Sequence, residues 1–169
     1  MFAIVQNGEI VKTSGSIRAL FPNTSFPASG PSAEFKKSQG VIEVVDGEQK
    51  DQRFYWVTPA NPSLQLVNGV PTRLYTNTPK ELEDVTETPE GQDEPVTTLG
   101  LKSQWIAQVK DNANKALAET DWYVIRKAER GTDIPADVVE KRAAIVAQCN
   151  EKEAAITAAT TVDELAQVI

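Results

Sequence analysis

The sequence predicts an α+β protein in which a small antiparallel β domain, residues 1–75, precedes a helical module, residues 99–169. In the first part, short runs of β-branched and aromatic residues alternate with Asn-Gly and Asp-Gly pairs, which are typical of hairpin turns. In the last part, apolar residues recur at helical spacing and indicate a helical hairpin or a three-helix unit. Residues 76–98 between them are acidic and contain several prolines, which predicts a linker.

The first hairpin is expected at the start of the chain. Met1–Val5 and Glu9–Thr13 flank Asn7-Gly8, a pair that readily adopts the positive φ angles of a type I′ turn. The side chains expected on its buried side are Phe2, Ile4, Ile10 and Val11.

Residues 14–31 are predicted as an ordered loop, because prolines and glycines interrupt any regular pattern. Single helical turns are expected at residues 16–20 and 32–37. Phe21 and Phe26 are interpreted as anchors that pack the loop, since loops must bury some apolar side chains; a ligand site is the alternative.

A second strand pair is predicted from residues 41–45 and 53–58, which flank Asp46-Gly47 and a longer turn. Three consecutive aromatic residues lie in its second strand: Phe54, Tyr55 and Trp56. Since neighbouring strand residues point to opposite faces, both faces of this strand are expected to be covered.

A third hairpin is predicted where Leu64–Val67 and Val70–Tyr75 flank Asn68-Gly69. Pro71 is expected near the start of its strand or on a sheet edge, where its missing N–H does little harm.

The predicted linker is strongly acidic. Its central part, residues 80–94, holds seven acidic residues and one basic residue, Lys80. Such a composition cannot bury enough apolar surface to fold by itself.

The first long helix is predicted from a stripe in which apolar residues recur every four positions: Leu101, Trp105, Val109, Ala113 and Leu117. Thr120 or Asp121 is then expected to cap a second, short helix, 122–130, by accepting from its exposed N–H groups. Gly131 is placed to end that helix in a left-handed conformation. Trp122 is interpreted as a core anchor at the helix junction, with an exposed binding contact as the alternative.

A third helix is predicted from about Asp133 to Ala158, with a stripe that includes Arg142, Ile145 and Cys149. Because charged residues interrupt this stripe, packing against the preceding helices is expected rather than a free-standing coiled coil. The sequence Thr161-Val-Asp-Glu164 is a capping-box pattern and predicts a last helix.

Composition argues against an enzyme. The formal net charge is -7, which disfavours nucleic acid as a partner, and histidine, the commonest general base and metal ligand, is absent. The single cysteine, Cys149, is interpreted as a small buried apolar residue. The acidic segment lacks the spacing of a calcium loop, so no catalytic, cofactor or metal site is expected. No apolar run is long enough to span a membrane, and the N-terminal residues lack the basic start of a signal peptide, so we expect a cytoplasmic protein.

Residues 117–142, LAETDWYVIRKAERGTDIPADVVEKR, resemble the C-terminal region of the tail-fibre assembly proteins, or tail assembly chaperones, of tailed bacteriophages. In that family a helix with a basic residue and a Leu leads into a Ser/Thr-Asp-Trp element, an Arg-containing helix and a further Arg. The matching residues here are Lys115, Leu117, Thr120, Asp121, Trp122, Arg126 and Arg142.

The resemblance implies a non-enzymatic protein that binds a trimeric tail fibre and assists its assembly in the host cytoplasm. The rival interpretation is a permanent structural component of the tail fibre or baseplate, retained in the virion tail, with homo-oligomerisation open. The candidate partner-binding residues are Trp105, Leu117, Asp121, Trp122, Tyr123 and Arg126.

Overall fold

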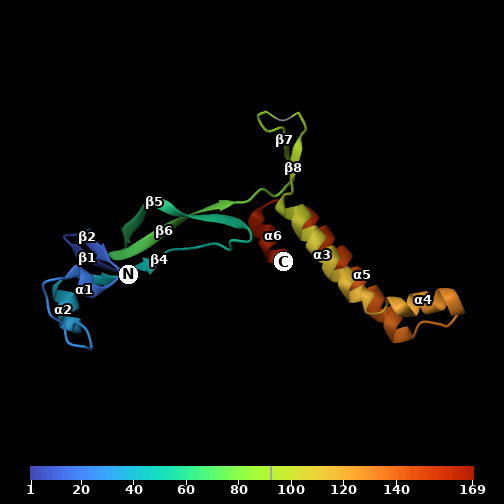
Figure 1. The fold of residues 1–169 in the computed structure, drawn as a ribbon, viewed down its shortest axis with the longest axis horizontal. Helices are drawn as coiled ribbons and strands as arrows, with labels where there is room; N and C mark the ends of the chain where they lie inside the picture. Colours follow the sequence, from blue (N-terminus) through green and yellow to red (C-terminus); the bar gives the residue numbers. More distant parts are fainter. Residues whose placement is uncertain (92) are drawn as a thin grey trace. The chain divides into compact units, whose positions relative to one another are not determined.

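A computed structural model describes residues 1–91 and 93–169, and the chain divides into two compact units, Met1–Thr78 and Pro79–Ile169. Small sheets and two short helices make up the first unit, whereas the second consists mainly of helices (Figure 1). The predicted α+β class is confirmed.

The first sheet begins with the predicted hairpin. Strand β1 (Phe2–Gln6) pairs antiparallel with β2 (Glu9–Ser14), and β3 (Val41–Glu43) pairs antiparallel with the other edge of β1. The turn residues Asn7 and Gly8 have φ angles of 53° and 79°, as a type I′ turn requires.

One side chain of this hairpin was predicted wrongly. The pairing of β1 with β2 shifts register between Ile4 and Val5, so that Lys12 and Ile10 have partners and Val11 lies between them as an extra residue. Val11 is 60% exposed, whereas Ile4 is buried. The buried cluster consists of Ile4, Ile17, Leu20 and Val41, with Phe2 and Phe21 packed against it.

Both predicted helical turns are present. Helix α1 (Ile17–Leu20) is capped by Ser16, and α2 (Ala33–Ser38) is capped by Ser32; each serine hydroxyl accepts from a backbone N–H of the first turn. The rings of Phe21, Phe26 and Phe35 meet edge to face, with centroids 5.1–6.4 Å apart. Phe21 and Phe26 therefore pack the loop, as predicted.

The second sheet contains the Asn-Gly hairpin, which is longer than predicted. Strand β5 (Tyr55–Val67) leads through Asn68 and Gly69, with φ angles of 52° and 80°, into β6 (Val70–Pro79). Pro71 lies near the start of β6, where it was expected, and is fully buried.

The predicted strand pair of residues 41–45 with 53–58 is wrong. Instead β4 (Val45–Asp46) runs parallel to β6, and Gly47 donates its N–H to the Arg73 carbonyl at 2.8 Å. Asp46 also pairs with Arg73 at 3.3 Å and accepts from the Tyr75 hydroxyl at 3.0 Å. Contacts to a strand far along the chain thus override the local turn signal, and neither Asp46 nor Gly47 has a positive φ.

Two of the three aromatic residues 54–56 are buried, and β5 begins at the second of them, Tyr55. Phe54 is 1% exposed and Tyr55 is buried, but Trp56 is 62% exposed. The prediction that both faces are covered is wrong at Trp56.

The second unit opens with a hairpin where a linker was predicted. Strands β7 (Val85–Glu87) and β8 (Val96–Thr98) pair antiparallel. The chain just before β7 folds onto the start of helix α3 (Leu101–Ala118). There the free N–H groups of residues 100, 101 and 102 donate to the Asp84 carboxylate at 2.7 Å, the Glu81 carbonyl at 2.9 Å and the Leu82 carbonyl at 3.0 Å.

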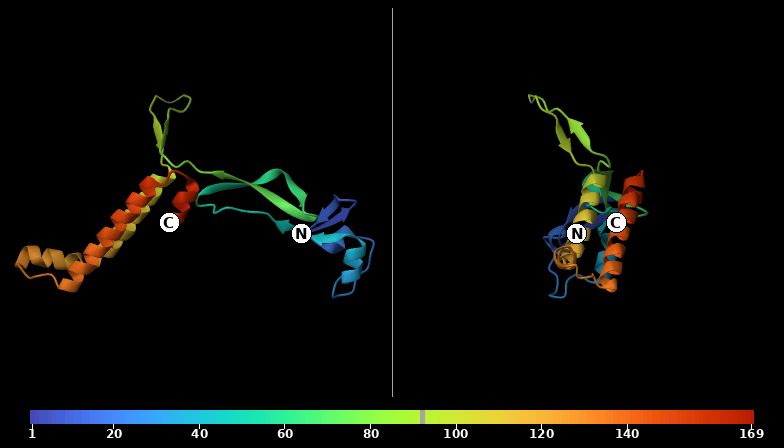
Figure 2. Two further views of the ribbon diagram at one scale, coloured as in Figure 1. Left: turned by 180° about the vertical axis from the view of Figure 1, so that it is seen from behind. Right: turned by 90° about the vertical axis from the view of Figure 1, so that its right-hand side faces the viewer.

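Helices α3 and α5 (Ala136–Ala158) lie side by side along their lengths (Figures 1 and 2). The predicted stripe of α3 is its less exposed side, and the expected packing of α5 against a preceding helix is confirmed. Helix α6 (Val162–Val168) follows the predicted capping box, in which Thr161 and Glu164 satisfy each other's backbone N–H groups.

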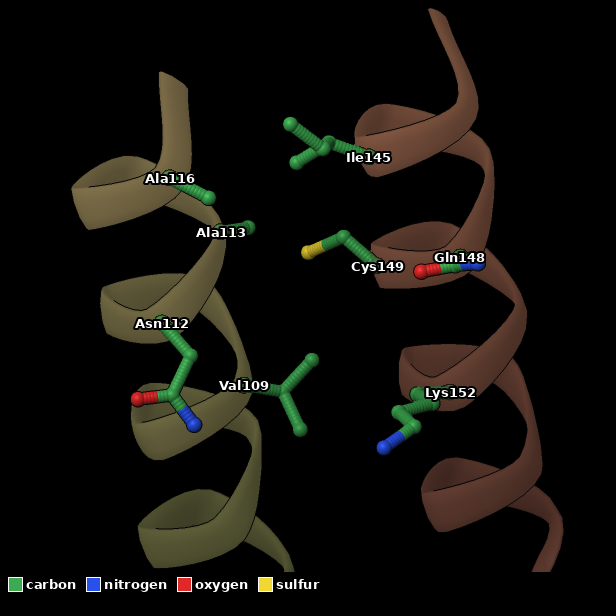
Figure 3. A pocket seen from close by; sticks show the side chains of 8 residues that line it. All are labelled: Val109, Asn112, Ala113, Ala116, Ile145, Gln148, Cys149 and Lys152. Atoms are coloured by element: carbon green, nitrogen blue, oxygen red, sulfur yellow. The ribbon is translucent and has the colours of Figure 1, made fainter. Parts of the chain in front are cut away.

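Burial in this helical pair is greatest near the end that carries α6, where Leu101, Ile156 and Leu165 are at most 2% exposed. In the middle, Cys149 and Ile145 of α5 point toward Val109 and Ala113 of α3 across a hollow (Figure 3). Cys149 is half-buried rather than fully buried as predicted.

Candidate partner-binding site

Helix α4 (Asp121–Arg130) joins the ends of α3 and α5 and extends away from that helical pair (Figures 1 and 2). It ends at Gly131, whose φ of 68° confirms the predicted left-handed C-cap. Lys127 and Arg130 lie in its last turn, where positive charge suits the negative end of the helix. None of its residues is buried, so α4 contributes little to the core of its unit.

Arg142 of α5 holds the start of α4 in place. Its Nη1 atom donates to the Leu117 carbonyl at 2.9 Å, to the Thr120 hydroxyl at 2.8 Å and to the Asp121 carboxylate at 2.9 Å. One guanidinium therefore joins the last turn of α3, the junction and the first turn of α4. The Leu117 carbonyl lies in the last turn of α3, where it also accepts from the Thr120 N–H at 3.0 Å, so Arg142 adds a charged donor to the end of α3.

The predicted capping of α4 needs a correction. Thr120 is its N-cap residue, but the Thr120 hydroxyl donates backward to the Leu117 carbonyl at 3.0 Å and makes no capping bond. Asp121 is the first helical residue, and its carboxylate binds Arg142. The nearby guanidinium attracts both side-chain oxygens away from the backbone N–H groups of α4.

Trp122 is not the core anchor that the sequence favoured. Its side chain is 50% exposed, and Ile125, one turn further, is 56% exposed. Together with Arg126, Glu129 and Arg130 these residues line a shallow hollow on one face of α4. Trp122 is therefore exposed, and its role as a binding contact stays a prediction.

Arg126 stacks on the aromatic residues of the same helix. Its guanidinium carbon lies 4.8 Å from the centre of the Trp122 ring and 5.3 Å from that of Tyr123. The two rings are themselves in contact, with centroids 3.8 Å apart and planes tilted by 31°. The Arg126 Nε atom is buried without an acceptor in the described part of the chain.

The structure gathers five of the six candidate residues at the α3–α4 junction: Leu117, Asp121, Trp122, Tyr123 and Arg126. Trp105 is separate, because it lies twelve positions before Leu117 in α3, about 18 Å along a helix axis. Trp105 belongs to the α3 stripe and is partly buried.

Two residues that shape this site were missed as candidates. Ile125 follows Trp122 by three positions, so its place on the same helix face could be found from spacing alone. Arg142 was noted only as a charge that interrupts the stripe of α5 and as part of the family pattern. Such an interruption is itself a signal, since a charge on a packed face requires partners.

Within residues 1–91 and 93–169 no group of three or more acidic or cysteine side chains could hold a metal ion. Over the same residues, no helix is both long enough and apolar enough to cross a membrane. The candidate site is thus a short helix with no buried residue that carries aromatic, aliphatic and cationic side chains on one face.

Comparisons with protein-family models, with curated proteins and with solved structures found no match to this chain.

Proposed function

We propose that this chain is a non-enzymatic assembly chaperone or accessory protein that binds a bacteriophage tail fibre through helix α4. The observation that carries the proposal is the exposure of Trp122 and Ile125 on a helix that buries none of its own residues. Exposed apolar side chains that gather on one face are typical of protein interaction sites, and Trp is the residue most enriched among strong binding contacts.

The Arg142 contacts support the same proposal. A binding helix that was free to move would lose conformational entropy when its partner docked. Arg142 joins the start of α4 to α3 and α5, so the position of the Trp122 face is set before binding. Preorganisation of this kind favours affinity without adding any contact to the partner.

The residues of this junction also carry the resemblance to tail-fibre assembly proteins. In that resemblance Trp122, Arg126 and Arg142 match the family pattern, and the structure places all three at α4 or in contact with it. A fibre chain exposes β-edges and apolar surface until its trimer closes, and a protein that covers them reduces misassociation.

Co-expression tests the proposal. The chain is produced together with the tail-fibre protein of the same phage, and the yield of soluble fibre trimer is measured by size-exclusion chromatography. We expect a higher yield with the wild-type chain than without it. An unchanged yield, together with no binding between the purified proteins, would refute the proposal.

Trp122→Ala tests the site, and Trp56→Ala is its matched control, because it removes another exposed Trp. We expect Trp122→Ala to weaken fibre binding about tenfold or more, in the range of strong interface contacts. The free energy of unfolding of the Trp122→Ala variant should change by about 1 kcal/mol or less, since the Trp122 side chain is half exposed. Trp56→Ala should bind as the wild type does. A Trp122→Ala variant that unfolds, or that binds normally, would contradict this assignment.

A permanent role in the virion is the second candidate. It is favoured by Val139 and Val146, which are 50% and 45% exposed and seven residues apart on α5, where they could pack against another subunit. Mass spectrometry of purified virions separates the two roles. A structural component would be present at a fixed copy number, whereas a released chaperone would be absent or sparse.

A further inference from the structure

The exposed face of α4 carries two arginines that the described chain does not neutralise. Arg126 and Arg130 are one turn apart and line the same hollow as Trp122 and Ile125. Within residues 1–91 and 93–169 neither arginine forms an ion pair, although Glu129 lies beside them, whereas Lys127 of the same helix pairs with Asp133 at 3.3 Å. Two cations are therefore free to bind an acceptor on a partner.

We propose that the partner segment that docks on α4 presents a carboxylate next to an apolar side chain. This inference rests on the proposed function and names the chemistry of the segment that the fibre contributes. The carboxylate is bound by Arg126 and Arg130, and the apolar side chain packs on Trp122 and Ile125.

The stacking of Arg126 prepares it for this role. The rings of Trp122 and Tyr123 both contact its planar guanidinium, so its orientation is restricted before a partner arrives. Burial of the Nε atom shows that part of the group is already dehydrated, which lowers the cost of removing water on binding. A planar guanidinium with free Nη donors matches the two oxygens of a carboxylate.

The charges of the chain favour a single carboxylate over a polyanion. Nucleic acids and anionic membranes are held by broad basic surfaces, but α4 offers two free arginines with Glu129 between them. The whole chain carries a formal charge of -7, so an extended anion would be repelled. One carboxylate flanked by apolar groups needs only the two arginines and the Trp122–Ile125 surface.

The same charge balance predicts which rate constant depends on the arginines. Because the net charge is negative, long-range attraction does not guide an acidic segment toward α4. The arginines act at contact, so their loss should raise the dissociation rate and leave the association rate nearly unchanged.

Binding kinetics test this inference. The purified fibre trimer is passed over the immobilised full-length chain by surface plasmon resonance, and the variants are Arg126→Gln, Arg130→Gln and the double substitution. We expect Arg126→Gln to weaken binding about tenfold, mainly through faster dissociation, and the double variant to weaken it further. Lys127→Gln is the matched control, since it removes a cation from the same helix, and should bind within about twofold of the wild type. Circular dichroism checks that every variant is folded.

A reciprocal experiment identifies the acid. Single Asp→Lys and Glu→Lys substitutions in the fibre should include one that weakens wild-type binding and restores binding to Arg126→Glu. This rescue would not arise if Arg126 acted only by supporting Trp122.

The remaining outcomes are distinguishable. If Trp122→Ala weakens fibre binding but the arginine variants bind normally, the carboxylate inference fails and the proposed function stands. If the wild-type chain does not bind the fibre, both fail. If light scattering without fibre shows a dimer that the arginine variants dissociate, the acid belongs to a second copy of this chain, and the inference about the fibre is wrong.

Discussion

Replacing Arg142 by Met removes the group that joins α4 to the rest of the helical unit. Met keeps most of the length and apolar character of the stem but has no donor. The change therefore deletes three hydrogen bonds, to the Leu117 carbonyl, the Thr120 hydroxyl and the Asp121 carboxylate, all between 2.8 and 2.9 Å.

The expected cost follows from the exposure of these partners. The side chain of Asp121 is 54% exposed, so its ion pair with Arg142 is screened and contributes less than about 1 kcal/mol. The Thr120 residue is only 8% exposed, and a hydrogen bond from a charged donor to such a group contributes about 1.5 kcal/mol. The Leu117 carbonyl keeps the Thr120 hydroxyl as a donor at 3.0 Å, so losing its bond to Arg142 costs less free energy than losing the bond to Thr120. The sum is about 2 kcal/mol lost from the free energy of unfolding.

Urea unfolding followed by ellipticity at 222 nm measures this loss, because the helices of the second unit dominate that signal. Lys141→Met is the matched control: Lys141 is adjacent on α5 and pairs with Glu119 at 3.3 Å in an exposed contact. Its effect should stay below about 0.5 kcal/mol. Hydrogen exchange adds a local measurement, and the amide of Tyr123, which donates to the Thr120 carbonyl, should lose protection in Arg142→Met.

A result in which Arg142→Met is as stable as Lys141→Met would refute this reasoning. It would mean that the geometry of the junction is set by backbone and apolar contacts alone. Weaker fibre binding by Arg142→Met, with the Trp122 face unchanged in sequence, would in turn support preorganisation of α4.

Three further predictions concern the rest of the second unit and are checked by the same urea measurement. Gly100→Ala should lower the free energy of unfolding by about 2–3 kcal/mol. An added Cβ would lie 2.5 Å from the Leu82 carbonyl oxygen and closer to Glu83, so the segment that caps α3 must move and lose its hydrogen bonds. An unchanged stability would contradict this prediction. Leu165→Ala should cost about 2–5 kcal/mol, since Leu165 is fully buried, and a smaller loss would show that α6 is not part of the core. Hydrogen bonds from Thr160 hold the pKa of Glu164 below its ordinary value, so its stabilising effect is present above that ordinary value and disappears as the pH falls through the lowered pKa. Glu164→Ala should therefore lower the urea midpoint at neutral pH and have little effect near about pH 2; equal effects at both would exclude an ionic contribution.

Elements that depend on local chemistry could be predicted from the sequence. Asn-Gly pairs readily adopt positive φ angles, as Asn7-Gly8 and Asn68-Gly69 do here, so both hairpins could be predicted. The capping box of Thr161 and Glu164 likewise needs only residues four positions apart or fewer.

Elements that depend on distant partners could not be predicted in the same way. Asp46-Gly47 resembles a hairpin turn, but the backbone of Arg73 binds that segment in a parallel pairing. The acidic residues before β7 resemble a linker by composition, yet Asp84 and its neighbours supply acceptors to the free N–H groups at the start of α3. Polar groups of a helix end can order a segment that has almost no apolar surface.

Trp122 shows where the helical pattern itself is ambiguous. Helical spacing predicts that the face with Trp122 and Ile125 packs against an apolar surface. It does not say whether that surface belongs to this chain or to another protein. Within the second unit, the stripe of α3 packs on α5, and no residue of α4 is buried. This exposed apolar face beside the Arg142 contacts, and the exposure of Trp122 above all, is the reason for proposing a partner outside the chain.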